Sequence, residues 1–322
     1  QIMNLIILNL KNRVHNNKLI LRSGIIKRII NIEINKSYAR IVFLRQSMKN
    51  IYIDDEIHQD ISLNISSKII GTTNQYYIND IEKERYVENV TKIIESKIRK
   101  TKKLTSKYKS IFYNIQTEDV IIRMIDNINI SNKSDILGLI KFNINQYMHI
   151  NIDDYVIEYK IINQINKIAK IQVILFPKYL IDLCKSISKN LRIKSQIINV
   201  NYDILQKLIE LNIITNLQSN LLFIENRSKE IIFNKVIDKK ICESYVLSKG
   251  EQCINYINNL DHNIDQIYYY GLEDKMINNE IDSFSSLNIS PLTLENNKKS
   301  IIISEKLSQD FKQYINTIGM II

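Results

Sequence analysis

The spacing of apolar residues changes period within one stretch of the chain, between Asp135 and Tyr159. A first set recurs at intervals of three and four, as on one stripe of a helix. Its members are Ile136, Leu139, Ile140, Ile144 and Tyr147. Tyr155, Ile157 and Tyr159 then alternate with other residues, as along a strand with one buried face. The pattern predicts a helix that leads into a strand.

Further runs flank this unit on both sides. A strand-like run, Asp119–Ile125, precedes it, and a second one, Ile168–Phe176, follows it. Pro177 then opens a predicted helix that reaches Ser188, and Ser195–Val200 reads as another strand. The order strand, helix, strand, strand, helix, strand predicts a compact two-layer α+β module.

Composition adds bounds to this picture. With 322 residues, 45% of them hydrophobic, the chain is long enough for two domains or one large lobed domain around a buried core. Glycine and proline are scarce, at 6 and 2 residues. Sites that approach a phosphate with bare backbone use glycines, so this scarcity argues against such a loop.

The net charge of +10 suits polyanions or an anionic membrane surface. The densest basic run, Ser96–Lys109, is either the solvated end of a helix with its loop or a patch that contacts phosphate or lipid. A nucleic-acid-binding protein is a remote alternative, because the sequence has no zinc-ligand spacing, aromatic RNA-binding motif or GxxG loop.

The expected compartment is a reducing cytoplasm. Cys184, Cys242 and Cys253 have neither metal-ligand nor disulfide spacing, and Cys184 falls on the apolar stripe of its helix. No apolar stretch reaches the roughly 18 residues of a membrane span, and the first residues lack the features of a cleaved signal. We expect a soluble protein.

The run IKFNINQYMHINIDDYVIEY, which ends at Tyr159, resembles the inserted subdomain of PilM-type proteins of type IV pilus assembly. These proteins are actin-like relatives of the cell-division protein FtsA, and their helix and strand read like IKFEINQYLPIN and DDYVIDY. The resemblance implies an α/β, two-lobed, ribonuclease H-like actin fold with a small inserted α+β subdomain. It divides the chain into a first lobe (29–118), the insert (119–201) and a second lobe with the returning C-terminal helix (202–322).

Residues 1–28 lie outside the resemblance. They are basic, and the sequence is consistent with three alternatives: an extra strand, a basic arm on a membrane surface, or a disordered lead.

The stretch from Ile29 to Leu44 resembles the first phosphate hairpin of the actin-like family, which reads like IDIGSSSIKIVEL. Glu33 stands at the aspartate that helps hold the metal, Asn35 at the glycine, and Arg40 at the lysine, while Lys36 and Ser37 fill the turn. Asparagine is the best non-glycine residue for a left-handed turn position. The alternative is a plain β-hairpin without a ligand.

The other nucleotide motifs are also altered. The second hairpin lies within Leu221–Lys235 but lacks Asp-x-Gly, and its turn holds Glu225, Asn226 or Arg227. A helix start resembling GGEQIT keeps Gly250 and Glu251. The adenosine-side motif, a strand that ends in a glycine pair, keeps only Gly271.

Each lost glycine adds a side chain where a ligand needs space, so we expect weak or absent ATP binding, with ATP and magnesium bound only if the altered turns still cradle them. The sequence shows no catalytic set. A metal site in the cluster that runs from Asp54 to Asp60, with Asp55, Glu56 and His58, is less expected than an acidic loop.

The resemblance implies a non-enzymatic scaffold at the cytoplasmic face of the inner membrane, in a type IV pilus or related secretion platform. It would bind the tail of a bitopic PilN-like membrane protein in extended form, alongside other platform proteins. The alternative is an active actin-like ATPase whose nucleotide state switches partner binding. Candidate partner-binding residues are Tyr147, Met148, Tyr155 and Tyr159, for which core packing is the other interpretation.

Overall fold

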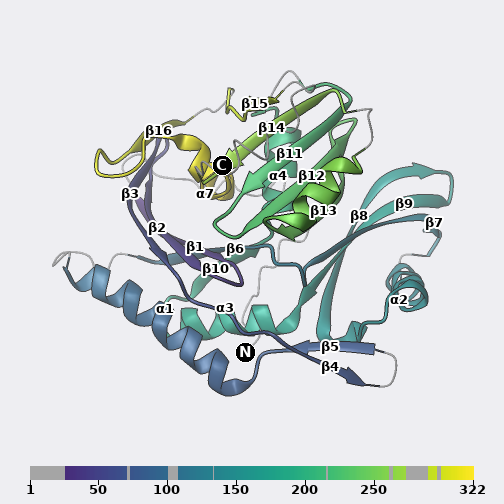
Figure 1. Ribbon diagram of the computed structural model, residues 1–322, viewed down its shortest axis with the longest axis horizontal. Coiled ribbons are helices and arrows are strands. Elements are labelled where there is room, and N and C mark those ends of the chain that lie inside the picture. The colour runs from purple at the N-terminus through teal and green to yellow at the C-terminus, as the bar shows by residue number, and fades with distance from the viewer. Residues whose placement is uncertain are drawn as a thin grey trace.

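The computed structural model describes most of the chain as two lobes with a third, smaller sheet beside them (Figure 1). The described residues are 26–70, 73–100, 108–132, 134–214, 217–260, 264–272, 289–295 and 299–322. Most of the N-terminal segment 1–28 and the middle of the basic run 96–109 lie outside them.

The first lobe is built on a six-stranded sheet in the order β10-β6-β1-β2-β3-β16. The strands are β1 (Lys27–Ile34), β2 (Ala39–Gln46), β3 (Asn50–Gln59), β6 (Ser110–Ile115), β10 (Ser195–Asn199) and β16 (Ser300–Ile303). Strands β1, β2 and β3 form an antiparallel meander, and β6 and β10 run parallel to β1. The apolar runs of β1, β2 and β6 are buried, as expected for strands covered on both faces.

The second lobe repeats this topology. Its sheet has the order β13-β12-β11-β14-β15, with β11 to β13 antiparallel and β14 and β15 parallel to β11. The strands are β11 (Asn220–Asn226), β12 (Glu230–Ile237), β13 (Lys240–Ser248), β14 (Gln266–Gly271) and β15 (Ile289–Pro291). Two copies of one mixed sheet confirm the predicted two-lobed α/β fold.

Helices cover both faces of the first sheet and also pack on the second lobe. The helices of the two lobes are α1 (Asp80–Lys100), α3 (Lys178–Asn190), α4 (Asn201–Glu210), α5 (Glu251–Asn258) and α7 (Ile315–Ile321), the last preceded by the short η3 (Phe311–Tyr314). Helices α1 and α3 contact each other, and α3 accepts a hydrogen bond at Cys184 from Tyr113 of β6 (2.9 Å). Ile318 of α7 packs against Ile29 and Leu44. The C-terminal helix thus returns to the first lobe.

Short elements complete the described chain. Strands β4 (Ser66–Ile70) and β5 (Thr73–Tyr77) form a separate hairpin. The three cysteines, all within the described residues, form no disulfide, and Cys184 lies in the main core, where burial raises its pKa. This confirms the packing role predicted for Cys184. Among the described residues, no helix combines the length and the apolar character needed to cross a membrane.

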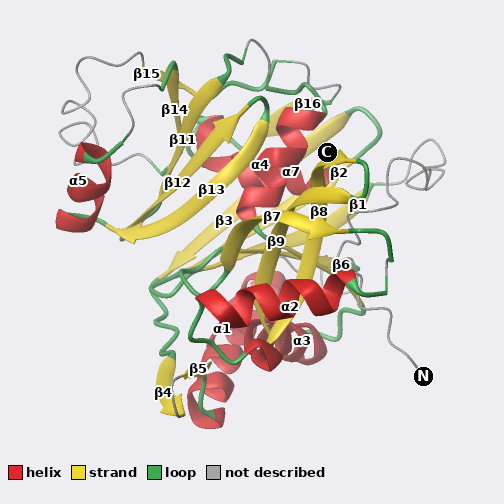
Figure 2. Cartoon of the chain, turned by 90° about the vertical axis from the view of Figure 1, so that its right-hand side faces the viewer, coloured by secondary structure: helices red, strands yellow, loops and turns green. Residues whose placement is uncertain are grey.

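The insert is a three-stranded antiparallel sheet, β7-β9-β8, with α2 lying across it (Figure 2). Its elements are β7 (Ile121–Asn129), α2 (Ile136–Tyr147), η1 (Ile152–Asp154), β8 (Tyr155–Ile165) and β9 (Ile168–Pro177). Ile136, Ile140 and Ile144 are the buried stripe of α2 and pack on the sheet. The predicted helix and strand are therefore present, but two residues of the predicted stripe, Leu139 and Tyr147, are exposed.

One boundary of the insert differs from the sequence prediction of 119–201. Helix α3 packs beside α1, and β10 pairs in parallel with β6, so both belong to the first lobe and the insert's sheet ends at Pro177. The alternation of apolar residues in Ser195–Val200 predicts a strand. It does not say which strand will pair with it, because pairing partners are set by the tertiary fold.

The crossing of α4 and α7 is tight enough to need a glycine. A Cβ on Gly319 would lie 2.4 Å from Cγ2 of Ile204, which is itself fully buried and has no room to move. We predict that Gly319→Ala lowers the free energy of unfolding by about 1–3 kcal/mol through overpacking, measured by urea denaturation.

The matched control is Gly138→Ala in α2. A Cβ there meets no atom within 4 Å, so only helix propensity changes and stability should rise by up to about 1 kcal/mol. If both variants were equally stable, the close α4–α7 contact would be contradicted.

Candidate functional site

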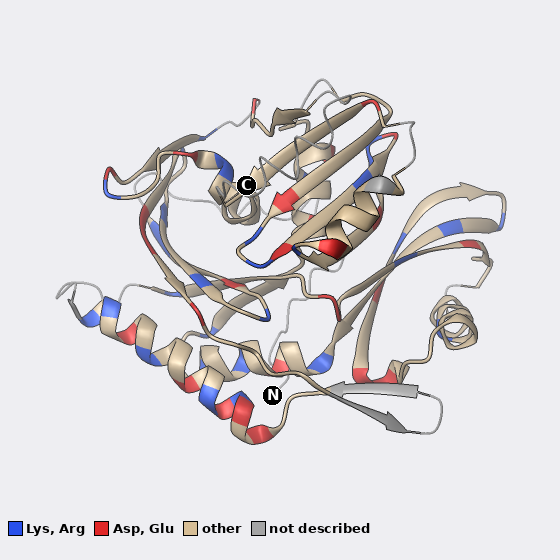
Figure 3. Ribbon diagram, viewed as in Figure 1, with Lys and Arg blue, Asp and Glu red and all other residues tan. Residues whose placement is uncertain are grey.

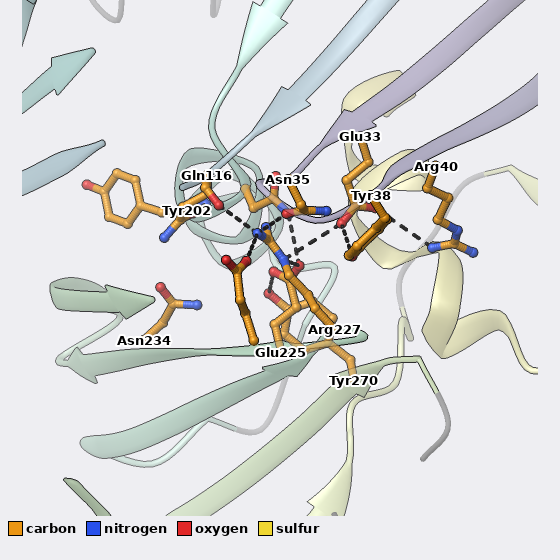
Figure 4. Close-up of polar contacts among 12 residues, drawn as sticks. Glu33, Asn35, Tyr38, Arg40, Gln116, Tyr202, Glu225, Arg227, Asn234 and Tyr270 are labelled. Carbon is orange, nitrogen blue, oxygen red and sulfur yellow. Dashed lines mark hydrogen bonds and ion pairs between the residues drawn. The ribbon is translucent and has the colours of Figure 1, made fainter. Parts of the chain in front are cut away.

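Two equivalent hairpin turns face each other between the lobes (Figure 4). The β1–β2 turn is closed by a hydrogen bond from Asn35 N to Tyr38 O (3.1 Å), and the β11–β12 turn by one from Arg227 N to Glu230 O (3.0 Å). Arg227 therefore stands in the second hairpin where Asn35 stands in the first. Two residues earlier, Glu225 matches Glu33 in the same way. This settles the register that the sequence left open.

Neither turn uses a left-handed residue at these positions. Asn35 and Arg227 are absent from the described residues with positive φ. The hairpins form with ordinary backbone geometry. The prediction that Asn35 takes a left-handed conformation is therefore wrong. A β-branched or charged side chain is tolerated in such a turn, which is how an arginine can occupy the second one.

The guanidinium of Arg227 joins the two lobes. Its Nε donates to Glu225 Oε1 of its own strand at 2.9 Å. Its Nη1 donates to the backbone carbonyl of Gln116 at 2.6 Å and to the Asn35 side chain, both in the first lobe (Figure 4). The side chain is only 1% exposed. A planar fork of donors suits such a set of fixed acceptors.

The charge of Arg227 balances carboxylates that converge from both lobes. Glu33 Oε1 lies 3.8 Å from its Nε, and both Glu33 and Glu225 are almost fully buried. Burial alone would lower the pKa of Arg227, but Glu225 and the neighbouring acidic groups outweigh it and raise that pKa. The guanidinium stays charged, as a buried pair of carboxylates requires.

Neutral donors complete the coordination of Glu225. Asn201 donates to its Oε1 at 2.9 Å and the Tyr270 hydroxyl to its Oε2 at 3.1 Å. In the first hairpin, the Tyr38 hydroxyl lies 3.4 Å from Glu33 Oε1. Burial and the adjacent carboxylates raise the pKa values of Tyr38 and Tyr270, so both hydroxyls keep their protons and donate.

Arg40, the residue that replaces the family's lysine, is held by the protein itself. Its Nε donates to Glu56 Oε1 of β3 at 2.5 Å, and its Nη1 donates to the carbonyl of Gln313. The guanidinium also lies 4.9 Å from the ring of Tyr314, whose hydroxyl donates to Glu56 at 2.7 Å. Burial would raise the pKa of Glu56, but Arg40 outweighs it and lowers that pKa. Arg40 is an anchor for the C-terminal segment.

The two other predicted turn residues point elsewhere. Lys36 pairs with Glu118 and lies 3.8 Å from Asp119. Burial raises the pKa of Asp119, although Lys36 partly opposes this. Ser37 Oγ is buried without a hydrogen-bond partner among the described residues.

The space left between the hairpins is small. A cavity of about 10 Å³ lies there, and it is lined by Glu33, Tyr38, Arg40, Glu225, Asn226, Tyr270, Gly271, Leu272, Lys312, Gln313 and Asn316. That is room for about one water, whereas ligand pockets measure about 300–1,000 Å³. Among the described residues, the two hairpins therefore leave no space of ligand size between them.

Gly271 is explained by the strand beside it. Its φ is 102°, and a Cβ would lie 2.2 Å from the carbonyl oxygen of Asn226, its neighbour on β11. Asn226 also donates its side-chain amide to the carbonyl of Leu272. The glycine permits this close backbone contact without any ligand.

Gly250 and Glu251 do not line the cavity between the hairpins. They begin α5, which packs through Cys253 against Ile264 and Ile267 of the second lobe. The preceding residue, Lys249, donates its backbone N–H to Lys229 in the second turn at 3.0 Å. The start of α5 thus lies next to the turn but outside the buried cluster.

Sequence reasoning did not single out Tyr38, Gln116, Asn201 and Tyr270, and it named Arg227 only as one of three candidates for the turn. A usable signal existed for Arg227. Glu33 and Asn35 in the first hairpin have the same spacing as Glu225 and Arg227 in the second. Aligning the hairpins with each other would have found the register, but the contacts between lobes could not be read in this way.

The insert has a groove beside β7. It measures about 380 Å³ and is lined by Arg123, Met124, Ile125, Asp126, Asn143, Ile144, Tyr147 and Met148. Two of the four predicted partner residues, Tyr147 and Met148, therefore lie on its wall, and Tyr147 is 77% exposed.

The other two predicted partner residues lie elsewhere in the insert. Tyr155 is buried in the insert's core, as in the alternative interpretation. Tyr159 lies on β8, at the opposite edge of the sheet from β7, and is packed against that core.

The acidic stretch of β3 is paired with cations. Asp54 accepts two hydrogen bonds from Arg45, and Asp55 pairs with Lys97 and Lys306. Within the part of the chain that the structure describes, no three potential ligands gather around a common metal position.

We predict that Gly271→Ala lowers the free energy of unfolding by about 3 kcal/mol or more, because the added Cβ meets backbone and the φ is strained. Gly250→Ala is the control: its φ is 103°, but a Cβ there has open space. It should cost only about 1–2 kcal/mol of backbone strain. Equal losses in chemical denaturation would show that the contact with Asn226 is not what requires Gly271.

No family model matches the chain, and no curated protein matches it. A chain of the PilM-PilN type IV pilus biogenesis complex is similar in structure, with a TM-score of 0.62 at 10% identity, over 90% of this chain and 96% of that one.

Two further structures align over similar lengths. One is a Bacteroides thetaiotaomicron protein with an actin-like ATPase fold (TM-score 0.48, 10% identity, 91% and 95% of the two chains). The other is the cytoplasmic domain of EpsL, an inner-membrane component of the type II secretion system of Vibrio cholerae (TM-score 0.46, 8% identity, 92% and 95%). The likeness to the chain of the PilM-PilN complex bears out the two-lobed fold predicted from the sequence.

Proposed function

We propose that this protein is a nucleotide-independent scaffold of a type IV pilus or related type II-like secretion platform. It acts at the cytoplasmic face of the inner membrane and binds the cytoplasmic tail of a PilN-like membrane protein. The likeness to the PilM-PilN complex supports the choice of assembly. The observation that carries the proposal is the buried Arg227, whose guanidinium fills the space between the lobes.

The physical argument against a nucleotide switch is one of charge and volume. Arg227 already supplies the cation that Glu33 and Glu225 need, and the remaining cavity of about 10 Å³ has no room for a phosphate chain. Moving Arg227 aside would leave two buried carboxylates unpaired and would break its bonds to the first lobe. That rearrangement costs several kcal/mol before any ligand is bound.

The groove beside β7 is our candidate for the tail. In the described part of the chain β7 pairs only with β9. Strand β13 lies near β7 without pairing with it, so the other edge of β7 keeps main-chain groups that an extended segment can bond. Met124, Met148 and the exposed Tyr147 offer adaptable apolar contacts there. Arg123 and Asp126 add one charge of each sign to the same wall.

A thermal-shift titration of the purified chain with magnesium ATP tests the first half of the proposal. A ligand that binds only the folded state must raise the melting temperature by mass action. We expect no change up to millimolar concentrations. A saturable, magnesium-dependent rise would instead favour the ATP-switch alternative.

Arg227 variants calibrate that experiment. Arg227→Ala should lower stability by about 3–5 kcal/mol, since it leaves Glu33 and Glu225 without their cation. Arg227→Lys keeps the charge but lacks the fork that reaches both Asn35 and Gln116. The stability of this variant should therefore lie between those of the wild type and Arg227→Ala.

Binding of the tail, the second half of the proposal, is tested by isothermal titration calorimetry with a peptide of the PilN-like tail. Tyr147→Asp should weaken binding at least tenfold, because it puts a carboxylate on the apolar wall of the groove. Tyr77→Asp, at another exposed tyrosine, which lies on β5 and does not line the groove, should bind as the wild type does. Equal affinities of the two variants would exclude this groove as the docking site.

A further inference from the structure

A second cavity lies at the other end of the first sheet from the Arg227 cluster. It measures about 290 Å³ and is lined by Arg28, Phe43, Arg45, Asp54, Asp55, Lys97, Ile98, Tyr108 and Lys306. Arg28 is near the start of β1, and the turn residue Asn35 follows the end of that strand. The six strand residues between them place Arg28 and Asn35 about 20 Å apart. The cavity is therefore independent of the site between the lobes.

The carboxylates of this cavity are already neutralised. Arg45 donates to both oxygens of Asp54 at 2.7 Å, and Lys97 and Lys306 each lie 2.7 Å from Asp55 Oδ2. Burial would raise the pKa of Asp55, but the two lysines outweigh it and lower that pKa. Four cationic side chains against two carboxylates leave a formal charge of +2 on the lining.

Lys97 differs from other basic residues of α1 in pairing with a residue outside the helix. Acidic and basic residues alternate along α1 (Figure 3), and pairs such as Lys92–Glu88 and Arg99–Glu95 balance each other within the helix. Lys97 instead reaches across to β3. It brings a cation from the last turns of α1 to the cavity wall.

Arg28 is a cation of the lining that still has an unused hydrogen-bond donor. Its Nη1 is buried with no hydrogen-bond partner among the described residues, and it lines the cavity. A buried donor without an acceptor is costly, so an acceptor at this position would be stabilising. An arginine fork is well matched to a phosphate group.

Part of the lining is apolar. The rings of Phe43 and Tyr108 meet edge to face, with centroids 5.7 Å apart, and Ile98 lies beside them. Burial raises the pKa of Tyr108 to about 12, so its hydroxyl is a neutral donor at physiological pH. A ring or short hydrocarbon can pack here while an anionic group reaches Arg28.

We propose that this cavity binds a small soluble phosphate monoester that carries one ring or a short apolar body. A phosphate monoester has a charge near −2 at pH 7, which complements the +2 of the lining. The volume of about 290 Å³ is at the lower limit of ligand pockets, so it admits a single-ring ester and excludes a nucleoside triphosphate.

The test is calorimetric titration of the full chain with phenyl phosphate. We expect saturable binding of one molecule per chain, and binding of inorganic phosphate at least tenfold weaker, because it lacks the ring. No binding of phenyl phosphate, or equal affinity for inorganic phosphate, would overturn the proposal. Vesicles that contain phosphatidic acid provide a further arm: binding to them without binding of the soluble ester would place the anion in a membrane and overturn it as well.

Variants tie the binding to this cavity. Arg28→Gln should weaken binding at least tenfold, and Lys306→Gln, at a side chain that is 57% exposed and safe for folding, should weaken it severalfold. Arg85→Gln, at an arginine of α1 whose side chain is 54% exposed and which lies twelve residues before Lys97, is matched in charge and should leave binding unchanged. Equal loss in all three would mean general attraction to a basic protein and would contradict a built site.

Discussion

The arrangement of the two lobes depends on one buried cation. Glu33 and Glu225 come from equivalent positions of two hairpins that face each other, so the symmetry of the fold brings two carboxylates together in a region closed to water. Like charges at that separation oppose burial unless a cation lies between them. Arg227 provides this cation from within the chain. Its position in the turn, in place of a small residue, is what makes this possible.

The same interaction limits how the lobes can move. Arg227 bonds to Glu225 in the second lobe and to Asn35 and Gln116 in the first, so separating the lobes would break a charged network and not merely an apolar contact. The C-terminal segment adds bonds of the same kind: Arg40 to Gln313, and Asn31 to Thr317 at 3.0 Å. Two-lobed folds often use the cleft between lobes as a hinge. Here a buried polar network occupies the space between the lobes, and this opposes a hinge motion.

Because the polar network occupies the space between the lobes, the larger cavities lie elsewhere on the described part of the chain. The groove beside β7 offers an unpaired strand edge with apolar side chains, which suits an extended peptide. The cavity beneath β2 and β3 offers excess positive charge beside an aromatic wall, which suits a small anion. The two differ in chemistry as well as in place, so one chain can present both without competition between their ligands.

The sequence by itself determined the elements and much of the fold. The period of Ile136, Ile140 and Ile144 specifies the buried face of a helix wherever that helix lies, and the run from Ile140 to Tyr159 is specific enough to indicate the inserted subdomain. The side chains that replace the family's glycines in the turns led to the expectation of weak or absent ATP binding. These features are local, since they depend on spacing within a few residues.

Only the tertiary structure decided where the elements pair and what the turns contain. The pairing of β10 with β6 assigns residues 178–199 to the first lobe, and the buried location of Tyr155 separates it from Tyr147 on the groove. Most of all, the partners of Arg227 lie 192 and 111 residues away in the sequence, at Asn35 and Gln116. An arginine in a turn reads as a solvated charge until the opposite lobe buries it, because burial and charge pairing belong to the assembled fold.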